Sequence, residues 1–331
     1  MAKKEKKVVG GNKGISAALA ALEKRFGEPV VRKMSDANLK VDTFSSGRAD
    51  LDIALGGGYG VGKIIEIFAE SGAGKTGLAL EAMAEIQKTG GVVAFIDAEH
   101  ALNTEYCEQI GVNIDDLYIS QPSWGEQAFE AIRALIYSGE VELIVVDSVS
   151  ALVPKAELEG ESGEAKMAIQ ARMMSQGMKL ITAAASDNGC TVMFINQLRK
   201  TMSMYGPSQI TSGGKALKFY ASQRLEVKNK GKLTEGDEVI GFKQNIVVVK
   251  NKIGSPFKGI DNDIVYGVGV DALAGLIEAL LFEEILVKAG SWFRYKDTNI
   301  AQGAKKLRVV LEDNPELLEE LKQVLKTKIK N

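Results

Sequence analysis

The stretch Lys63–Leu80, with the sequence KIIEIFAESGAGKTGLAL, decides the fold. Its first part is a short run of β-branched and aromatic apolar residues, which predicts a buried strand rather than a helix. A loop over Ala69–Thr76 follows, and then a helical apolar pattern through Met83. A strand, a glycine-containing loop and a helix N-terminus point backbone N–H groups at one spot, where the helix dipole adds positive potential. The stretch therefore predicts a phosphate-binding loop.

The residues of this loop have separate predicted roles. We expect Lys75 to reach the β- and γ-phosphates of a nucleotide and the Thr76 hydroxyl to ligate Mg²⁺. The usual pattern is G-x-x-x-x-G-K-[ST], and here Ala69 stands at its first position. Because alanine resists positive φ, the start of the loop must have an ordinary φ or take its flexibility from Gly72. The expected nucleotide-binding residues of the loop are Ala69, Glu70, Ser71, Gly72, Ala73, Gly74, Lys75, Thr76 and Gly77.

The composition is that of an ordinary globular protein. The chain has 331 residues, 45% of them hydrophobic and 25% charged, with a net charge of −2, so any contact with a polyanion must be local. No apolar run is long enough to span a bilayer, and the basic N-terminus lacks the apolar segment of a secretion signal. Two cysteines form neither a disulfide framework nor a metal spacing. We therefore expect a reducing, cytoplasmic location and no membrane.

Helical and strand patterns alternate after the loop. Ligands in parallel sheets bind at the carboxyl ends of strands, where the loop, Glu99 and Asp147 are expected. Strands that are apolar throughout, alternating with helices, predict an α/β fold with a mostly parallel, doubly wound sheet. The predicted strands are Val92–Ile96, Leu117–Ser120, Leu143–Val146 and Thr191–Ile195, and the predicted helices are 101–110, Gly125–Tyr137 and Lys166–Ser186.

The two ends of the chain are predicted to form separate parts. A helix near Ile15–Phe26 and a strand at Val30–Val31 cannot form a core alone, so residues 1–35 would dock on this chain or on a neighbouring subunit. Residues 36–270 would form the main domain, and residues 271–331 a small α+β C-terminal domain whose first helix begins at Asp271 and is closed by Gly290. Late strands predict an antiparallel edge of the main sheet, at Leu217–Val227, Asn245–Ile253 and Ile264–Val268.

Polar residues that follow the predicted strands are candidates for the chemistry. Asp147 would hold Mg²⁺, directly or through water. Glu99 could orient and deprotonate an attacking water, although Asp97 competes for that role. Gln197 could sense the γ-phosphate, but an exposed polar residue explains the pattern equally well.

Several cations have two interpretations. Lys250 and Lys252 point to one face of a strand, which suits an anionic target, but a solvated face is favoured by the pattern alone. The segment Arg199–Gly214 mixes cations, methionines, a tyrosine and glycines, which suits single-stranded nucleic acid, and a flexible linker is the alternative. Tyr106 could stack on a base or simply pack.

Longer motifs resemble bacterial RecA recombinases. The resemblance extends in order from about Gly14 into the C-terminal domain, and motifs of this length and number are highly specific. They are AFIDAEHAL at Ala94–Leu102, LIVVDSVSAL at Leu143–Leu152, ARMMSQGM at Ala171–Met178, FINQLR at Phe194–Arg199, GGKALKFYAS at Gly213–Ser222 and VKNKIGSPFK at Val249–Lys258.

The resemblance implies an ATP-dependent recombinase that forms head-to-tail helical filaments on single-stranded DNA and exchanges strands with homologous double-stranded DNA. It implies ATP and Mg²⁺ as cofactors and allows recombination mediators or a repressor as further partners. By position, Glu99 becomes the catalytic glutamate and Gln197 the γ-phosphate sensor. Tyr106 and Tyr266 become nucleotide-binding residues. The full implied catalytic set is Lys75, Glu99, Gln197, Lys250 and Lys252.

The resemblance replaces the solvated-face interpretation of Lys250 and Lys252, and it implies that they reach the ATP of the adjacent subunit.

The resemblance also implies a set of DNA-binding residues from two loops and one helix face. Its members are Glu159, Gly160, Lys166, Arg172, Ser175, Lys179, Arg199, Lys200, Met202, Met204, Gly213 and Gly214. The phosphate loop AESGAGKT departs from the usual GPESSGKT, and the second DNA loop is about one residue short. A hexameric RecA-fold helicase is the alternative function, and a nucleotide-binding regulator without DNA function is the second.

Overall fold

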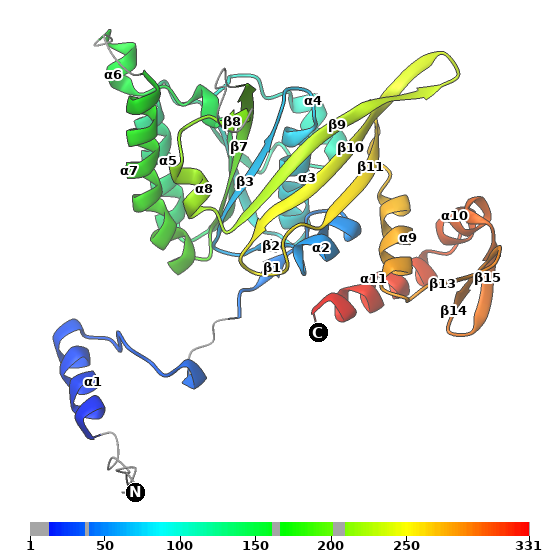
Figure 1. Cartoon of the computed structure of the whole chain (residues 1–331), viewed down its shortest axis with the longest axis horizontal. Coiled ribbons are helices and arrows are strands. Elements are labelled where there is room, and N and C mark those ends of the chain that lie inside the picture. The colour runs from blue at the N-terminus through cyan, green and yellow to red at the C-terminus, as the bar shows by residue number, and fades with distance from the viewer. Residues whose placement is uncertain (1–12, 37–39, 161–165, 201–208, 331) are drawn as a thin grey trace, which may run out of the picture. The chain divides into compact units, whose positions relative to one another are not determined.

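The computed structural model describes residues 13–36, 40–160, 166–200 and 209–330, the last of these ranges ending one residue before the C-terminus (Figure 1). For residues 13, 36, 166, 167, 200 and 330 it describes the backbone alone. The chain divides into two compact units, Met1–Val41 and Asp42–Asn331.

The first unit contains the helix α1, Lys13–Phe26, and a short 3₁₀ helix, η1, at Met34–Asp36. The prediction of a strand at Val30–Val31 is wrong, because these residues are in no strand and are 55% and 52% exposed. Two β-branched residues favour extended backbone, but a strand also needs a hydrogen-bonded neighbour.

The second unit is built on one large sheet. Among the described residues its strand order is β12-β11-β10-β9-β3-β7-β6-β4-β5, with β8 paired to β7. The run from β9 to β5 is parallel, and β9 to β12 pair antiparallel, so the predicted mostly parallel sheet with an antiparallel edge is confirmed. The bounds are β3 Ile64–Ala69, β4 Val92–Asp97, β5 Leu117–Ser120, β6 Val141–Asp147, β7 Thr191–Lys200, β8 Gln209–Thr211, β9 Gln223–Glu235, β10 Glu238–Asn251, β11 Gly259–Val265 and β12 Gly269–Val270.

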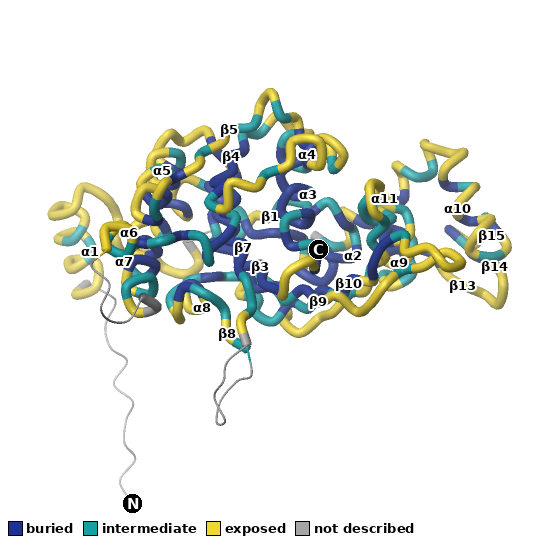
Figure 2. Tube along the Cα trace, turned by 90° about the horizontal axis from the view of Figure 1, so that it is seen from above, coloured by how far each residue is buried: buried dark blue, intermediate teal, exposed yellow. Residues whose placement is uncertain are grey.

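Helices cover both faces of this sheet, as Figure 2 shows by the buried strands between exposed outer surfaces. One apolar cluster joins the sheet to α2 (Ala49–Leu55), α3 (Lys75–Lys88) and α4 (Thr104–Ile110). The other joins it to α5 (Gly125–Ser138), α7 (Lys166–Asp187) and α8 (Ala216–Tyr220). Neighbouring residues of β3, Ile64 and Ile65, belong to opposite clusters, as the alternation of a strand requires.

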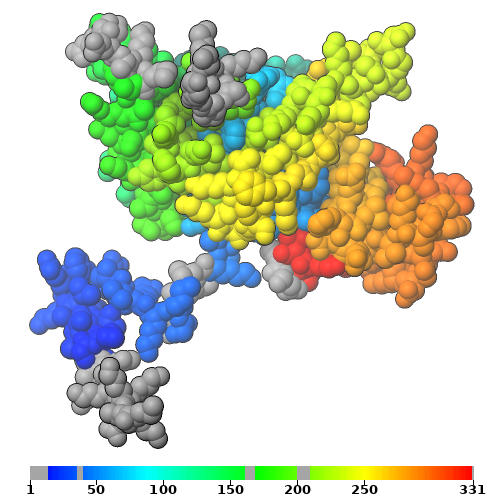
Figure 3. Space-filling view, viewed as in Figure 1, coloured from blue at the N-terminus to red at the C-terminus, as the bar shows by residue number. Residues whose placement is uncertain are grey.

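Short elements complete this part of the unit. β1 (Thr43–Phe44) and β2 (Tyr59–Gly60) pair antiparallel, and η2 (Val149–Ala151) and α6 (Lys155–Leu158) follow β6. The tip of the β9–β10 hairpin projects beyond the surrounding surface (Figure 3).

Several sequence-based boundaries are wrong. The strand expected at Leu217–Val227 is α8 followed by β9, and the segment Arg199–Gly214 contains β8. The strands expected at Asn245–Ile253 and Ile264–Val268 are β10, which begins at Glu238, and β11, which ends at Val265. The helix expected from residue 101 begins at Thr104, because the Asn103 side chain caps it by accepting from Tyr106 N at 3.0 Å.

The C-terminal part has its own core, confirming the expected small α+β domain. Its elements are α9 (Ala272–Phe282), β13 (Val287–Ala289), β14 (Trp292–Tyr295), β15 (Thr298–Gln302), α10 (Ala304–Glu312) and α11 (Pro315–Lys330). Asp271 caps α9 by accepting from Ala274 N at 3.0 Å. Gly290 does not close α9, which ends at Phe282; it lies between β13 and β14. No helix in the described ranges is long and apolar enough to cross a bilayer.

Candidate functional site

The loop between β3 and α3 takes its left-handed positions at glycines. Gly72 and Gly74 have φ of 72° and 85°, whereas Ala69, the last residue of β3, has no positive φ. An alanine at the first loop position is therefore compatible with this backbone. Gly74 is the N-cap of α3, so unpaired N–H groups of the first helical turn face the loop.

Lys75 folds back onto the loop. Its Nζ donates a hydrogen bond to Glu70 O at 2.9 Å, and the residue is 9% exposed. Burial lowers the pKa of Lys75, and the negative charges of Asp147 and Glu99 oppose that shift. The ammonium group is thus held at the loop with two carboxylates near it.

The two predicted metal ligands lie together. Thr76 Oγ1 donates to Asp147 Oδ2 at 2.7 Å. Burial raises the pKa of Asp147 to about 6, against the lowering effect of the Thr76 hydrogen bond. Hard oxygen donors suit Mg²⁺, which in such sites keeps waters and takes phosphate oxygens as further ligands. Among the described residues no group of three or more His, Cys, Asp or Glu side chains is placed to hold a metal ion, so a metal here would need those extra ligands.

Glu99 and Gln197 also meet, although 98 positions separate them. Gln197 Nε2 donates to Glu99 Oε1 at 3.0 Å, and Ser148 Oγ donates to the same oxygen. Ser148 is fully buried, and its hydroxyl lies 2.7 Å from that of Ser150. Sequence reasoning missed Ser148; its position directly after Asp147, at the end of an apolar strand pattern, was the available signal.

The geometry favours Glu99 over Asp97 as the carboxylate that acts on water. Asp97 is 2% exposed, and its oxygens accept from Ala101 N at 3.1 Å, Leu102 N at 3.3 Å and Gln121 Nε2 at 2.9 Å. These contacts hold the turn after β4. Glu99 is exposed beside Gln197, and within the described residues the recorded hydrogen bonds go to its Oε1, which leaves Oε2 to accept from a ligand.

The two tyrosines lie against different parts of the loop and helix. A Cβ at Gly77 would lie 2.8 Å from the Tyr106 hydroxyl, so Tyr106 packs on the first turn of α3. Tyr266 packs on Phe242 with ring centroids 6.2 Å apart, and Phe242 lies against Gly74. Both rings are partly exposed, at 38% for Tyr106 and 62% for Tyr266.

Lys250 and Lys252 lie at the end of β10, beside α8. Lys250 Nζ donates to Lys218 O at 2.8 Å and to Phe219 O at 3.1 Å. Burial and then the positive charge of Lys252 lower the pKa of Lys250, so the two ammonium groups are neighbours. The recorded hydrogen bonds of Lys250 go to backbone carbonyls rather than to the carboxylates of the loop region.

The DNA-binding residues predicted on α7 share an outer face. Arg172 and Lys179 are exposed and Ser175 is half-buried, while Met174 and Met178 are buried in the core. Arg199, on β7, is also exposed, as are Glu159 and Gly160 after α6. Met202 and Met204, and the side chains of Lys166 and Lys200, lie outside the described residues.

Gly213 and Gly214 have a packing role of their own. Their φ values are 80° and 76°. A Cβ at Gly213 would lie 2.8 Å from Val149 Cγ1, and one at Gly214 would lie 2.7 Å from Ala171 Cβ. The chain therefore passes close to η2 and α7 at this point, which only glycine allows.

The fold and the site together define a P-loop NTPase. A glycine-bearing loop precedes α3, and the carboxyl edge of a mostly parallel sheet carries Lys75, Thr76, Asp147, Glu99 and Gln197. Comparison with known proteins narrows this class. The family model for the RecA N-terminal domain matches residues 13–271, and the one for the RecA C-terminal domain matches residues 275–330.

Individual relatives also point to the RecA family. The Protein RecA of Fusobacterium nucleatum is 47% identical over 97% of this chain and 85% of its own length. Those of Clostridium novyi and Acinetobacter baylyi are 46% and 45% identical over 96% of this chain, covering 91% and 92% of their own lengths. The chain belongs to the RecA family, the recombinases of DNA recombination and repair.

Proposed function

We propose that this recombinase is a DNA-dependent ATPase that uses ATP and Mg²⁺. The observation that carries the proposal is the convergence of Lys75, the Thr76–Asp147 pair and the Glu99–Gln197 pair at one edge of the sheet. Phosphoryl transfer needs a cation at the phosphates, oxygen ligands for a metal and a carboxylate that orients water. The residues present supply all three.

Each residue has a distinct part in this proposal. The loop N–H groups and Lys75 bind the phosphates, and Thr76 and Asp147 hold Mg²⁺, which neutralises charge on the phosphate oxygens. Glu99 orients the attacking water and accepts its proton. Gln197 donates to Glu99, so a γ-phosphate that attracts the Gln197 amide would change the hydrogen bonding of the catalytic carboxylate.

We also propose that the working form is a head-to-tail filament on single-stranded DNA, which pairs with homologous double-stranded DNA. Residues 1–35 would dock on the neighbouring subunit, 36–270 would form the ATPase domain and 271–331 the C-terminal domain. Lys250 and Lys252 would act on the neighbour's ATP, and the α7 face with Arg172 and Lys179 would face the DNA. Head-to-tail contacts of this kind form open helices. Family membership supports a cytoplasmic location.

The test is electron microscopy and ATP hydrolysis on the same samples. With single-stranded DNA and a slowly hydrolysed ATP analogue, we expect helical filaments, and with ATP we expect hydrolysis that DNA stimulates. DNA affinity should fall with rising salt and depend on nucleotide. Closed rings that translocate would support the helicase alternative, and nucleotide binding without any DNA binding would support a regulator.

A further inference from the structure

A buried polar cluster lies behind the phosphate-binding loop. Arg48, only 4% exposed, donates through Nε and Nη2 to both oxygens of Glu81 at 2.6 and 2.9 Å. Its Nη1 donates to Gln244 Oε1 at 2.9 Å and to Asn262 Oδ1 at 3.2 Å. These residues come from three different elements, α3, β10 and β11, and from the segment before α2. Burying a guanidinium is costly unless its donors are paired, and here each of its three nitrogens donates at least one hydrogen bond.

Gln244 joins this cluster to the loop. It is 1% exposed, and its Nε2 donates to the backbone oxygen of Ala73 at 2.7 Å. A Cβ at Gly74 would lie 2.6 Å from the same nitrogen, so the amide sits directly against the loop backbone. The contact therefore restrains the peptide that joins Ala73 to Gly74.

Arg48 decides which way the amide faces. A guanidinium only donates hydrogen bonds, so the Gln244 oxygen must face Arg48 and the NH₂ group must face Ala73 O. The carboxylate of Glu81 in turn holds Arg48 in a bidentate arrangement, which fixes the guanidinium plane. The orientation of a loop carbonyl is thus set by a chain of charged and amide groups that reaches α3.

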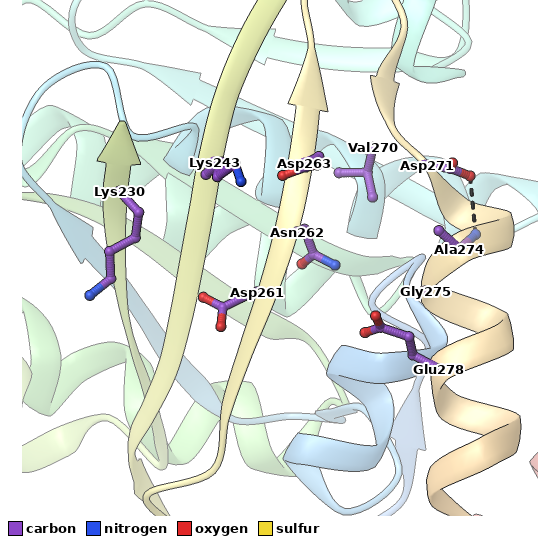
Figure 4. A pocket seen from close by; sticks show the side chains of 10 residues that line it. All are labelled: Lys230, Lys243, Asp261, Asn262, Asp263, Val270, Asp271, Ala274, Gly275 and Glu278. Atoms are coloured by element: carbon purple, nitrogen blue, oxygen red, sulfur yellow. Dashed lines mark hydrogen bonds between the residues drawn. The ribbon is translucent and has the colours of Figure 1, made fainter. Parts of the chain in front are cut away.

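The cluster ends at a cavity on its far side. Asn262 Nδ2 donates to Asp50 Oδ2 at 2.7 Å, and Asp50 lies against Gly275 of α9, where a Cβ would be 3.3 Å from Asp50 Oδ1. Figure 4 shows Asn262 and Gly275 on facing walls of this cavity, which has a volume of about 450 Å³ between β9–β11 and α9. The cavity wall contributes to holding Arg48, and among these residues the recorded hydrogen bond to the loop is the one from Gln244.

We propose that Gln244, oriented by Arg48, is a positioning residue for the phosphate-binding loop. In a trans peptide the C=O and the following N–H point in opposite directions, so holding Ala73 O toward Gln244 turns the N–H of Gly74 away from it. That N–H then faces the side of the loop that receives the phosphates. A preoriented donor binds an anion without first reorganising the loop. This inference rests on the proposed binding of ATP.

The test compares two buried glutamines in the full-length protein. Gln244→Leu removes the contact with the loop. Gln223→Leu is the matched control, because Gln223 is fully buried and hydrogen-bonds the backbone of Gly60 and Gly58 at 3.0 and 3.1 Å, away from the loop. We expect Gln244→Leu to weaken ATP binding about tenfold, the size expected for one well-placed hydrogen bond, with kcat at saturating ATP nearly unchanged. Gln223→Leu should leave the ATP Kd within about twofold.

A second variant separates positioning from folding. Gln244→Glu keeps the acceptor that pairs with Arg48 but puts a carboxylate oxygen against Ala73 O in place of the N–H donor. We expect it to stay folded, as near-UV circular dichroism would show, and to lose at least as much ATP affinity as Gln244→Leu.

The outcomes distinguish this inference from the proposed function. Wild-type protein that does not bind ATP would overturn both. If the wild type binds ATP and Lys75→Ala does not, while both Gln244 variants bind like the wild type, only the positioning role is wrong. Equal losses in Gln244→Leu and Gln223→Leu would also overturn it, because the effect would then be one of general stability.

Discussion

The charges at the phosphate-binding loop and those at the end of β10 differ in what surrounds them. Around the loop, Lys75 is influenced by Asp147 and Glu99 of the same chain. At the end of β10, the pKa of Lys250 is lowered by burial and then by the charge of Lys252, and its ammonium group contacts only backbone carbonyls in its recorded hydrogen bonds. The first group of charges is assembled within one chain. In the second group three cations, Lys252, Arg224 and Lys218, lower the pKa of Lys250, and one carboxylate, Glu66, raises it. This excess of positive charge is suited to an anion from another subunit.

The largest expected effect tests the charges at the phosphate-binding loop, which are assembled within one chain. Lys75→Ala removes the ammonium group from the loop, so we expect hydrolysis to fall to background and ATP binding to weaken strongly. Lys63→Ala is the control, since Lys63 precedes the same strand at its other end and lies at the surface by Ser186. Both activities are measured by steady-state ATPase and nucleotide-binding assays. Undiminished hydrolysis in folded Lys75→Ala protein would contradict the loop assignment.

The next effect tests Lys250 and Lys252 at the end of β10, which are proposed to act on the ATP of a neighbouring subunit. Cations supplied across an interface contribute roughly 10³-fold or more to phosphoryl transfer. Replacing Lys250 and Lys252 by Ala should therefore abolish the stimulation of hydrolysis by single-stranded DNA. Nucleotide affinity of the unassembled protein should stay nearly unchanged, because Lys250 donates its recorded hydrogen bonds to α8 and, among the described residues, neither lysine has a recorded hydrogen bond to the loop.

Mixed filaments show whether these lysines act in trans. Glu99→Gln protein keeps both lysines, and the Lys250→Ala/Lys252→Ala protein keeps Glu99. Some junctions in a mixture would pair intact Glu99 with intact lysines, so part of the DNA-stimulated hydrolysis should return. If mixtures that co-assemble recover nothing at any ratio, the lysines do not act on the neighbour's ATP.

A smaller effect is expected from Glu99, the carboxylate proposed to act on water. Glu99→Gln keeps the shape and loses the base, so turnover should fall about 10²-fold while ATP binding and filaments persist. Asp97→Asn is the control within the same turn, and because Asp97 holds backbone N–H groups it should lower stability more than turnover. Both are measured by single-turnover hydrolysis and urea unfolding. A normal rate per bound ATP in Glu99→Gln would leave Glu99 with no role in the chemistry.

The sequence predicted the sheet and the loop region well because both depend on local patterns. The apolar strand Ile64–Phe68 and the loop ending in Lys75–Thr76 each occupy consecutive positions, and the strand ends that carry Glu99 and Asp147 meet at one edge in any parallel sheet. Short elements were harder to predict. α8 has five residues, and Leu217 is buried against the sheet by tertiary contacts that no five-residue pattern encodes.

The Gln244 cluster could not be predicted from local sequence. Arg48 and Gln244 are 196 positions apart, and each is an ordinary polar residue in its own segment. One weak sign was present, since Gln244 stands between Phe242 and Ile246, inward-facing positions of an otherwise apolar strand face. A polar residue at such a position must find buried partners, but the sequence does not say which ones.

The smallest expected effect concerns Lys250 alone, and it separates the contribution of this residue to stability from its proposed role in hydrolysis. Lys250→Met removes two hydrogen bonds to the carbonyls that end α8, and it also removes the repulsion from Lys252. Partly exposed hydrogen bonds and cations at helix C-termini each contribute about 1 kcal/mol or less, and the relief of repulsion from Lys252 offsets part of their loss. The net fall in the free energy of unfolding should therefore be about 1 kcal/mol. Urea unfolding without DNA or nucleotide measures this, with Lys252→Met as the control on an exposed neighbour. The same Lys250→Met protein should still lose most of its DNA-stimulated hydrolysis, because the role proposed for Lys250 arises only after assembly. A stability loss of about 3 kcal/mol or more would instead make Lys250 a structural residue of its own chain, and the contrast between the two regions would lose its basis.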